Sequence, residues 1–216
     1  LEGDYEATNR RAARRLAGWE ELPLTEEPLF NADWYPPSVV PSPALVNIEG
    51  DERLEIVTPA ADGHMYAFGP EADLLWRHDY TKGHPLVYAS EAAVADLGGD
   101  GRPEIIFSTY GEPGGNYGRL VILSSNGELL HDIDLPDQNA DSGNGVGGCA
   151  TPTVADVDGD GDLEILVLTI DHGLDVFEVP GSSCNCVPEG ADGDLYCGPW
   201  PTGRGNYLRN GRAPGS

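Results

Sequence analysis

The stretch Asp156-Val-Asp158-Gly-Asp160-Gly161-Asp162-Leu-Glu164 decides the fold of this chain. Oxygen-bearing side chains fill positions 1, 3, 5 and 9 of the segment, and the glycine at position 6 permits a tight turn. At position 7 we expect the backbone carbonyl to be the ligand, so the side chain there is free to vary. Because Ca²⁺ takes about six to eight oxygen ligands in flexible geometry, the segment predicts a calcium-binding loop.

Two imperfect copies precede this third loop, a first loop at 47–55 and a second loop at 96–104. The second loop has Gly98 at position 3, and the first loop has Glu52 in place of the turn glycine. We therefore expect the affinity for Ca²⁺ to decrease from the third loop to the second and then to the first. The predicted ligands, with Arg53, Arg102 and Asp162 acting through their backbone carbonyls, are Asn47, Glu49, Asp51, Arg53, Glu55, Asp96, Asp100, Arg102, Glu104, Asp156, Asp158, Asp160, Asp162 and Glu164.

The residues that flank the loops indicate strands rather than helices. Each loop is preceded by a short apolar run and continues into a β-branched or aromatic run, as in Glu104-Ile-Ile-Phe107. An EF-hand needs a glutamate at position 12 and a helix on each side, but position 12 is Thr58, Phe107 or Val167. Each loop is therefore expected to connect two strands, as a hairpin turn that an ion holds closed.

The spacing of the loops predicts a β-propeller. The loops start at 47, 96 and 156, so the repeat periods are 49 and 60 residues, which suit four-stranded blades. We expect an all-β domain at 38–216 with three such blades, the last strand of the third being displaced to about 200–203. Since closed propellers have about four to eight blades, three blades make an incomplete propeller. Another chain, a second copy or a missing part of a precursor would have to complete it.

The pattern around the loops resembles the FG-GAP/VCBS repeat of integrin-alpha-like propellers and of many secreted microbial proteins. Val94-Ala-Asp-Leu-Gly-Gly-Asp-Gly101 and Val154-Ala-Asp-Val-Asp-Gly-Asp-Gly161 carry the resemblance. The ending Trp200-Pro-Thr-Gly-Arg-Gly-Asn-Tyr-Leu-Arg-Asn-Gly211 is similar to the tail that closes many secreted members. The resemblance extends over about 38–211 and implies a propeller. It does not fix the function, because the family includes adhesins, lectin-like modules, lyases and scaffolds.

Charge and hydropathy exclude several classes of partner. The 216 residues include 37 acidic and 12 basic side chains, which gives a formal net charge of −25. Such a surface repels nucleic acid and anionic membranes, and the sequence has no apolar run long enough to span a bilayer. With no signal peptide and a start at Leu1, the chain reads as a mature chain or as part of a longer precursor. We expect an extracellular or cell-surface location.

The four cysteines are Cys149, Cys184, Cys186 and Cys197. In an oxidising compartment they predict disulfides, with Cys149 and Cys197 each bonded to either Cys184 or Cys186, because a one-residue spacer fits disulfide geometry poorly. A zinc site made of all four thiolates is the competing interpretation, although the sequence contains no C-x-x-C pair.

Residues 1–37 form a separate segment in sequence character. The periodicity of 4–21 predicts a helix with Asp4 as its N-cap, and a proline-rich linker follows at 22–37. The helix is either packed on its own propeller or is a docking arm for an acidic neighbour. Its basic side chains are Arg10, Arg11, Arg14 and Arg15.

No catalytic residues are predicted. Gly143-Asn-Gly145-Val-Gly147-Gly148 fits the dinucleotide fingerprint, but a strand follows it where that motif needs a helix. Acidic residues at 132, 134, 137 and 141 could supply an acid/base pair, but a solvated run is the more usual reading. We expect a non-catalytic calcium-binding propeller module for adhesion, ligand binding or extracellular assembly. Its partners are other protein chains, with carbohydrate as a further candidate ligand. The alternative is part of a polysaccharide lyase or hydrolase.

Overall fold

The structure is a computed structural model that describes residues 41–51, 53–84, 86–112, 115, 117–136, 145–170, 172–182, 187–188, 195–196 and 201–203. The chain divides into two compact units, Leu1–Ser38 and Val39–Ser216, and every described residue belongs to the second. The helix predicted at 4–21 and the linker at 22–37 lie outside the described residues. Within these residues all regular structure is β, so the all-β prediction is confirmed. They include no helix that is long and apolar enough to cross a membrane.

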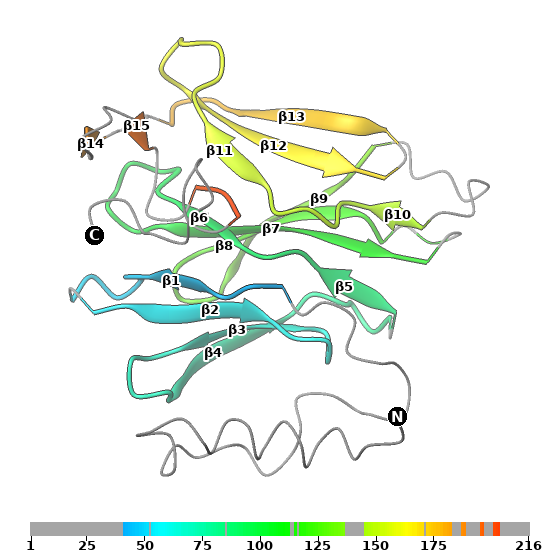
Figure 1. Cartoon of the computed structure of the whole chain (residues 1–216), viewed down its shortest axis with the longest axis horizontal. Coiled ribbons are helices and arrows are strands. Elements are labelled where there is room, and N and C mark those ends of the chain that lie inside the picture. Colours follow the sequence, from blue (N-terminus) through cyan, green and yellow to red (C-terminus); the bar gives the residue numbers. More distant parts are fainter. Residues whose placement is uncertain are drawn as a thin grey trace, which may run out of the picture. The chain divides into compact units, whose positions relative to one another are not determined.

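Three antiparallel sheets follow one another along the chain (Figure 1). The first sheet has the order β1-β2-β3-β4 and comprises β1 (Ala44–Val46), β2 (Glu55–Pro59), β3 (His64–Phe68) and β4 (Leu74–Asp79). The second sheet comprises β5 (Val87–Ala89), β6 (Ala93–Ala95), β7 (Glu104–Gly111), β8 (Arg119–Leu123), β9 (Leu129–Asp134) and β10 (Val146–Gly147). The third has the order β11-β12-β13 and comprises β11 (Thr153–Ala155), β12 (Leu163–Thr169) and β13 (Gly173–Val179). A separate pair is formed by β14 (Val187–Pro188) and β15 (Leu195–Tyr196).

The three sheets repeat the same hairpin at the same register. The last residue of the first strand pairs with the glutamate at position 9 of the loop: Val46 with Glu55, Ala95 with Glu104, and Ala155 with Glu164. Each acidic loop therefore connects two neighbouring antiparallel strands, as the sequence predicts.

The sheets differ in how many strands they contain. The second sheet has six, because β5 and β10 also pair with β7, and the third has three within the described residues. The sequence places the fourth strand of the third sheet at about 200–203. For the described residues 201–203 this prediction is wrong. The Pro201 carbonyl accepts a hydrogen bond of 2.8 Å from the Val154 amide, so this segment lies beside β11 rather than beyond β13. The described sheets do not close into a ring.

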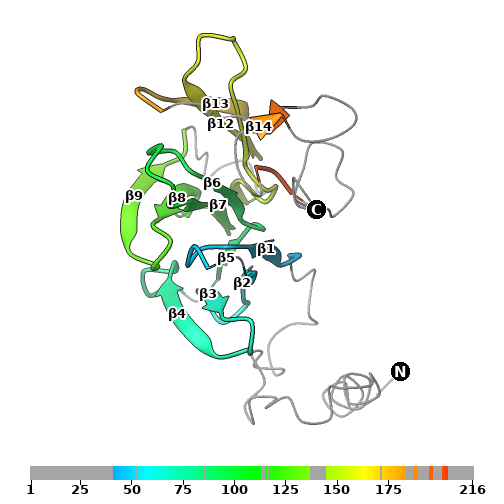
Figure 2. The same cartoon turned by 90° about the vertical axis from the view of Figure 1, so that its left-hand side faces the viewer.

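Apolar side chains between the sheets form two cores. Met65, Ile105 and Phe107 are fully buried between the first and second sheets, while Ile106, Leu120 and Ile165 are buried between the second and third. The strands β1 and β11 both contact β6, and Figure 2 shows the sheets in succession from β1–β4 to β11–β13. Each fully buried large apolar side chain stabilises the fold by about 1.5–3 kcal/mol. These cores therefore fix the positions of the strands that carry the loops.

Candidate metal centre

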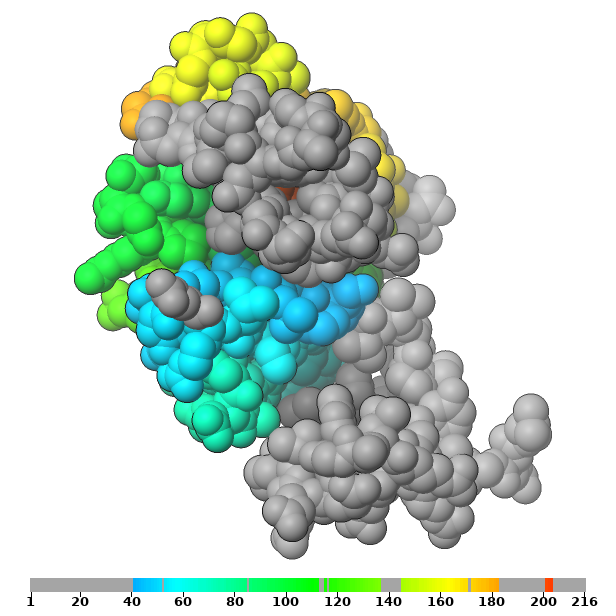
Figure 3. All heavy atoms as spheres, turned by 60° about the vertical axis from the view of Figure 1, so that its left-hand side comes forward, coloured from blue at the N-terminus to red at the C-terminus, as the bar shows by residue number. Residues whose placement is uncertain are grey.

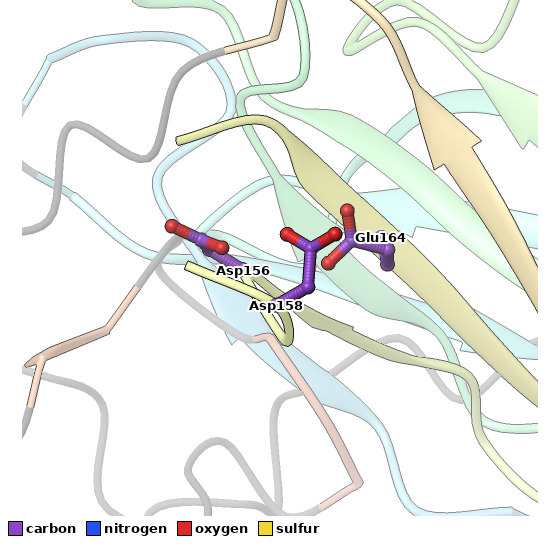
Figure 4. A group of neighbouring side chains, drawn as sticks. All are labelled: Asp156, Asp158 and Glu164. Atoms are coloured by element: carbon purple, nitrogen blue, oxygen red, sulfur yellow. The ribbon is translucent and has the colours of Figure 1, made fainter. Parts of the chain in front are cut away.

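The third loop gathers three carboxylates between β11 and β12. Oxygen atoms of Asp156, Asp158 and Glu164 all lie within 4.8 Å of one another. Figure 4 shows Asp158 between the other two side chains. Glu164 is buried, Asp156 is half-buried and Asp158 is exposed, so the group opens to solvent on one side. This cluster can hold a metal ion.

The glutamate at position 9, buried in the first and third loops and half-buried in the second, anchors each loop through the same hydrogen bond. Oε2 of Glu55, Glu104 and Glu164 accepts the amide of the residue at position 2, which is Ile48, Leu97 or Val157, at 2.7 Å in all three loops. This bond orients the carboxylate toward the loop, because one oxygen is fixed on the backbone. In the first loop the other oxygen, Oε1 of Glu55, has no hydrogen-bond partner.

The side chains at positions 1 and 5 also fold each loop onto itself. The carboxylates of Asp51, Asp100 and Asp160 accept the amide of position 7 at 2.9–3.0 Å. Asn47 and Asp156 accept the amide of position 4, at 2.6 and 2.7 Å. These local bonds explain why acidic side chains in this pattern form a compact turn even though their charges repel one another.

Sequence reasoning missed the glycine at position 4. Gly50, Gly99 and Gly159 have φ angles of 79°, 66° and 82°, a left-handed conformation that strongly favours glycine. The signal was present in the sequence, because position 4 is glycine in all three loops. Position 6, where the turn glycine was expected, is also left-handed at Gly101 and Gly161, with φ of 82° and 100°.

The segment that follows β13 contacts the third loop through two hydrogen bonds. The Gly181 amide donates to Asp162 Oδ2 at 3.1 Å, and the Leu163 amide donates to Ser182 Oγ at 2.7 Å. The Asp162 carboxylate is thus engaged with the backbone after β13. Sequence reasoning did not find Gly181 or Ser182, because a single Gly-Ser pair well after the loop carries no pattern.

The second loop lacks one acidic ligand. Gly98 stands at position 3, and both oxygens of Asp96 are engaged, accepting the Asp100 amide at 3.1 Å and the Gly101 amide at 2.7 Å. Burial raises the pKa of Glu104 above its ordinary value, although the Leu97 amide opposes the rise. Among the described residues, three acidic side chains come within ligand distance of one another only in the third loop.

The first loop carries a competing cation. The Arg53 guanidinium contacts Asp51, with Nε 2.9 Å from Oδ2, and the Arg53 amide and side chain lower the pKa of that carboxyl. Glu49 is exposed, and Glu52 lies outside the described residues. One observation still fits a cation here: Glu55 is fully buried and its Oε1 has no hydrogen-bond partner.

The other candidate site residues from the sequence do not join the metal cluster. Asp132 forms ion pairs with Arg119 and Lys82, while the acidic residues at 137 and 141 lie outside the described residues. The dinucleotide-like stretch contains β10, and the next element after it is the strand β11, as expected, rather than a helix. Cys149 is a free, exposed thiol, and the disulfides predicted from the sequence stay a prediction. The other three cysteines lie outside the described part.

Fold and loops together define an all-β protein built from repeated hairpins with acidic turns. Residues 96–167 match the family model of the FG-GAP-like repeat, which confirms the resemblance for this part of the chain. No curated protein matches the sequence. Among solved structures, the crystal structure of the V. cholerae biofilm matrix protein Bap1 is similar at 22% identity and a TM-score of 0.39. The match covers 68% of this chain and 24% of that one, so this chain corresponds to about a quarter of its length.

Proposed function

We propose that the three sheets are blades of a β-propeller and that the chain is a non-catalytic calcium-binding module outside the cell or at its surface. Its roles would be adhesion, ligand binding or extracellular assembly. The observation that carries the proposal is the group of Asp156, Asp158 and Glu164, whose oxygens lie within 4.8 Å of one another. The FG-GAP-like repeat at 96–167 and the net charge of −25 support the location.

The donor set favours calcium over other metals. All three clustered ligands are carboxylates, whereas zinc sites in proteins are built largely from cysteine and histidine. The cluster is open to solvent on the Asp158 side, which leaves room for waters and for the backbone carbonyl of Asp162. Irregular coordination of this kind suits Ca²⁺ better than Mg²⁺, which demands near-octahedral geometry.

An ion in the third loop would act as a clamp on the hairpin. Asp156 directly follows β11, and Glu164 pairs across to Ala155 from within β12. A bound cation would therefore join both strands and remove the repulsion among the carboxylates. Because β12 also packs in the core against the second sheet, clamping this hairpin would stiffen the sheet that carries the loop.

The chemistry of the second sheet supports a non-catalytic role. Asp132 is one of the four acidic residues considered for acid/base work, and it forms ion pairs with Arg119 and Lys82. Burial pushes the pKa of Asp132 up, yet the hydrogen bonds from these two residues hold it below its ordinary value. A general acid near neutral pH requires the opposite shift, so this residue does not suit a polysaccharide lyase or hydrolase.

The test is thermal unfolding of the chain in Ca²⁺ and in a chelator. Calcium at about a hundredfold excess over its dissociation constant stabilises a single site by about 2.7 kcal/mol, which raises Tm by about 5–10 °C at this chain length. Asp158→Asn should abolish most of this rise. Glu128→Gln, which removes an exposed carboxylate from the turn between β8 and β9, should leave it intact. Equal melting of the parent chain with and without Ca²⁺ would refute the proposal.

A further inference from the structure

Each sheet has two faces, and the register shows which residues share them. Residues directly opposite on neighbouring strands point to the same side of a sheet, as do residues two apart along a strand. The leading face is defined by three equivalent positions in each sheet: Val57, Met65 and Ala67; Ile106, Leu120 and Ile122; and Leu166, Leu174 and Val176.

The opposite, trailing face is also defined by equivalent positions. Its members are Leu45, Ile56 and Phe68 in the first sheet; Val94, Ile105 and Leu123 in the second; and Val154, Ile165 and Phe177 in the third.

Inside the molecule, a leading face always packs on the next trailing face. Val57 and Met65 of the first sheet share a core with Ile105 and Leu123 of the second. Ile106, Leu120 and Ile122 of the second sheet share the other core with Val154 and Ile165 of the third. The same contact is thus made twice between successive repeats, with apolar side chains at matching positions.

The two outermost faces are left without this contact among the described residues. On the leading face of the third sheet, Leu174 and Val176 are 58% and 54% exposed, and the neighbouring Leu168 is 56% exposed. Their counterparts in the second sheet, Leu120 and Ile122, are 0% and 4% exposed. Figure 3 shows the third sheet, in yellow, and the first, in blue and cyan, on opposite sides of the green second sheet.

The trailing face of the first sheet is open in the same way. Leu45 is 41% exposed, while its counterparts Val94 and Val154 are 0% exposed. Ile56 and Phe68, on the same face, are only half-buried. This chain therefore carries both halves of the contact that joins its own repeats. Exposed apolar faces of this kind mark interaction sites.

We propose that the leading face of the third sheet binds the trailing face of the first sheet in a second copy of this chain. The occupant is a second copy because the two open faces repeat the chemistry of the two internal contacts. Such an interface joins different surfaces of the two copies, so it either closes a ring or extends a filament. Two copies bring six sheets together, which lies within the range of about four to eight blades for closed propellers. The assembly is thus a closed dimer with two identical contacts.

The net charge of the chain opposes this association and makes it depend on ionic strength. Two copies at −25 each repel one another, whereas the contact itself is apolar. Salt screens exposed charges beyond about 10 Å at 0.1 M. Dimerisation is therefore stronger at higher ionic strength, the reverse of what an interface made of ion pairs would show.

The experiment measures the mass of the full chain by light scattering over a range of protein and salt concentrations. The expected result is a particle of twice 23.0 kDa that dissociates on dilution. Leu174→Ser and Leu45→Ser should each shift the chain to monomer with unchanged circular dichroism. Leu130→Ser should leave the dimer intact, because Leu130 is similarly exposed, at 47%, but lies on the outer strand of the second sheet.

Mixing the two disrupted variants tests the pairing of the faces. Leu174→Ser keeps an intact trailing face and Leu45→Ser keeps an intact leading face, so the mixture should recover a heterodimer through a single native contact. A monomer at every concentration, a dimer that survives both substitutions, or growth into larger particles would each overturn the proposal. None of these results depends on Ca²⁺ binding, so this proposal and the calcium proposal fail separately.

Discussion

Leu120 and Leu174 occupy the same repeat position but differ completely in burial. Leu120 is 0% exposed between the second and third sheets, whereas Leu174 is 58% exposed on the outer face of the third. Each pairs with the equivalent residue of the preceding strand, Ser108 or Leu168. Replacing either leucine by alanine makes the same chemical change at the same repeat position. The difference between the two effects therefore reports mainly the packing of one sheet on the next.

The magnitude follows from what the truncation removes. Each buried carbon group contributes about 0.8 kcal/mol, so Leu120→Ala loses about 2.4 kcal/mol of transfer free energy. The cavity left behind increases the loss, and buried leucine-to-alanine changes cost about 2–5 kcal/mol in all. Leu174→Ala removes atoms that are already largely in water. Its effect on the monomer should stay within about 0.5 kcal/mol.

Urea unfolding gives both values. The measurement is made under dilute, low-salt conditions in which light scattering shows a monomer, so that contacts between copies do not contribute. We expect the midpoint to fall sharply for Leu120→Ala and hardly at all for Leu174→Ala, with unchanged slopes. Equal losses in the two variants would refute the sheet-on-sheet packing described here.

Three further predictions concern single interactions. Trp76→Phe removes the 2.9 Å hydrogen bond from Nε1 to the Ser125 carbonyl and should lower the free energy of unfolding by about 1 kcal/mol. An unchanged urea midpoint would contradict this contact between the first two sheets. Gly101→Ala should cost about 1–2 kcal/mol because its φ is 82°, while Gly98→Ala, which meets nothing within 4 Å, should be nearly neutral in the same assay. Asp132→Asn should cost up to about 1 kcal/mol at pH 7. Burial raises the pKa of Asp132, but Arg119 and Lys82 hold it below its ordinary value. The contribution is therefore present above the unfolded pKa of about 4 and is lost as pH falls through the folded pKa. Urea midpoints of parent and variant should converge in acid.

The sequence predicts those parts of the fold that depend on local pattern. The acidic loops, the strands beside them and the hairpins that these strands form follow from residues close together in the chain. Pairing between distant segments could not be predicted in this way. The addition of β5 and β10 to β7, and the placement of Pro201 beside Val154, depend on tertiary packing, and short polar or glycine-rich segments carry no periodic signal.

The candidate site, too, was predicted only where it depends on local sequence spacing. Asp156, Asp158 and Glu164 were predicted as ligands from their spacing, and the structure brings them together. The spacing did not show that Arg53 contacts Asp51, because a residue assigned for its carbonyl can still place its side chain on a neighbour. Nor did it show that Gly181 and Ser182 support the third loop, since these contacts span 19 residues.

A crystal structure of the chain grown with Ca²⁺ tests the central claim most directly. We expect ion density in the third loop at about 2.3–2.6 Å from oxygens of Asp156, Asp158 and Glu164, with weaker density or none in the first loop. A fully ordered third loop that contains no ion at saturating Ca²⁺ would contradict the account.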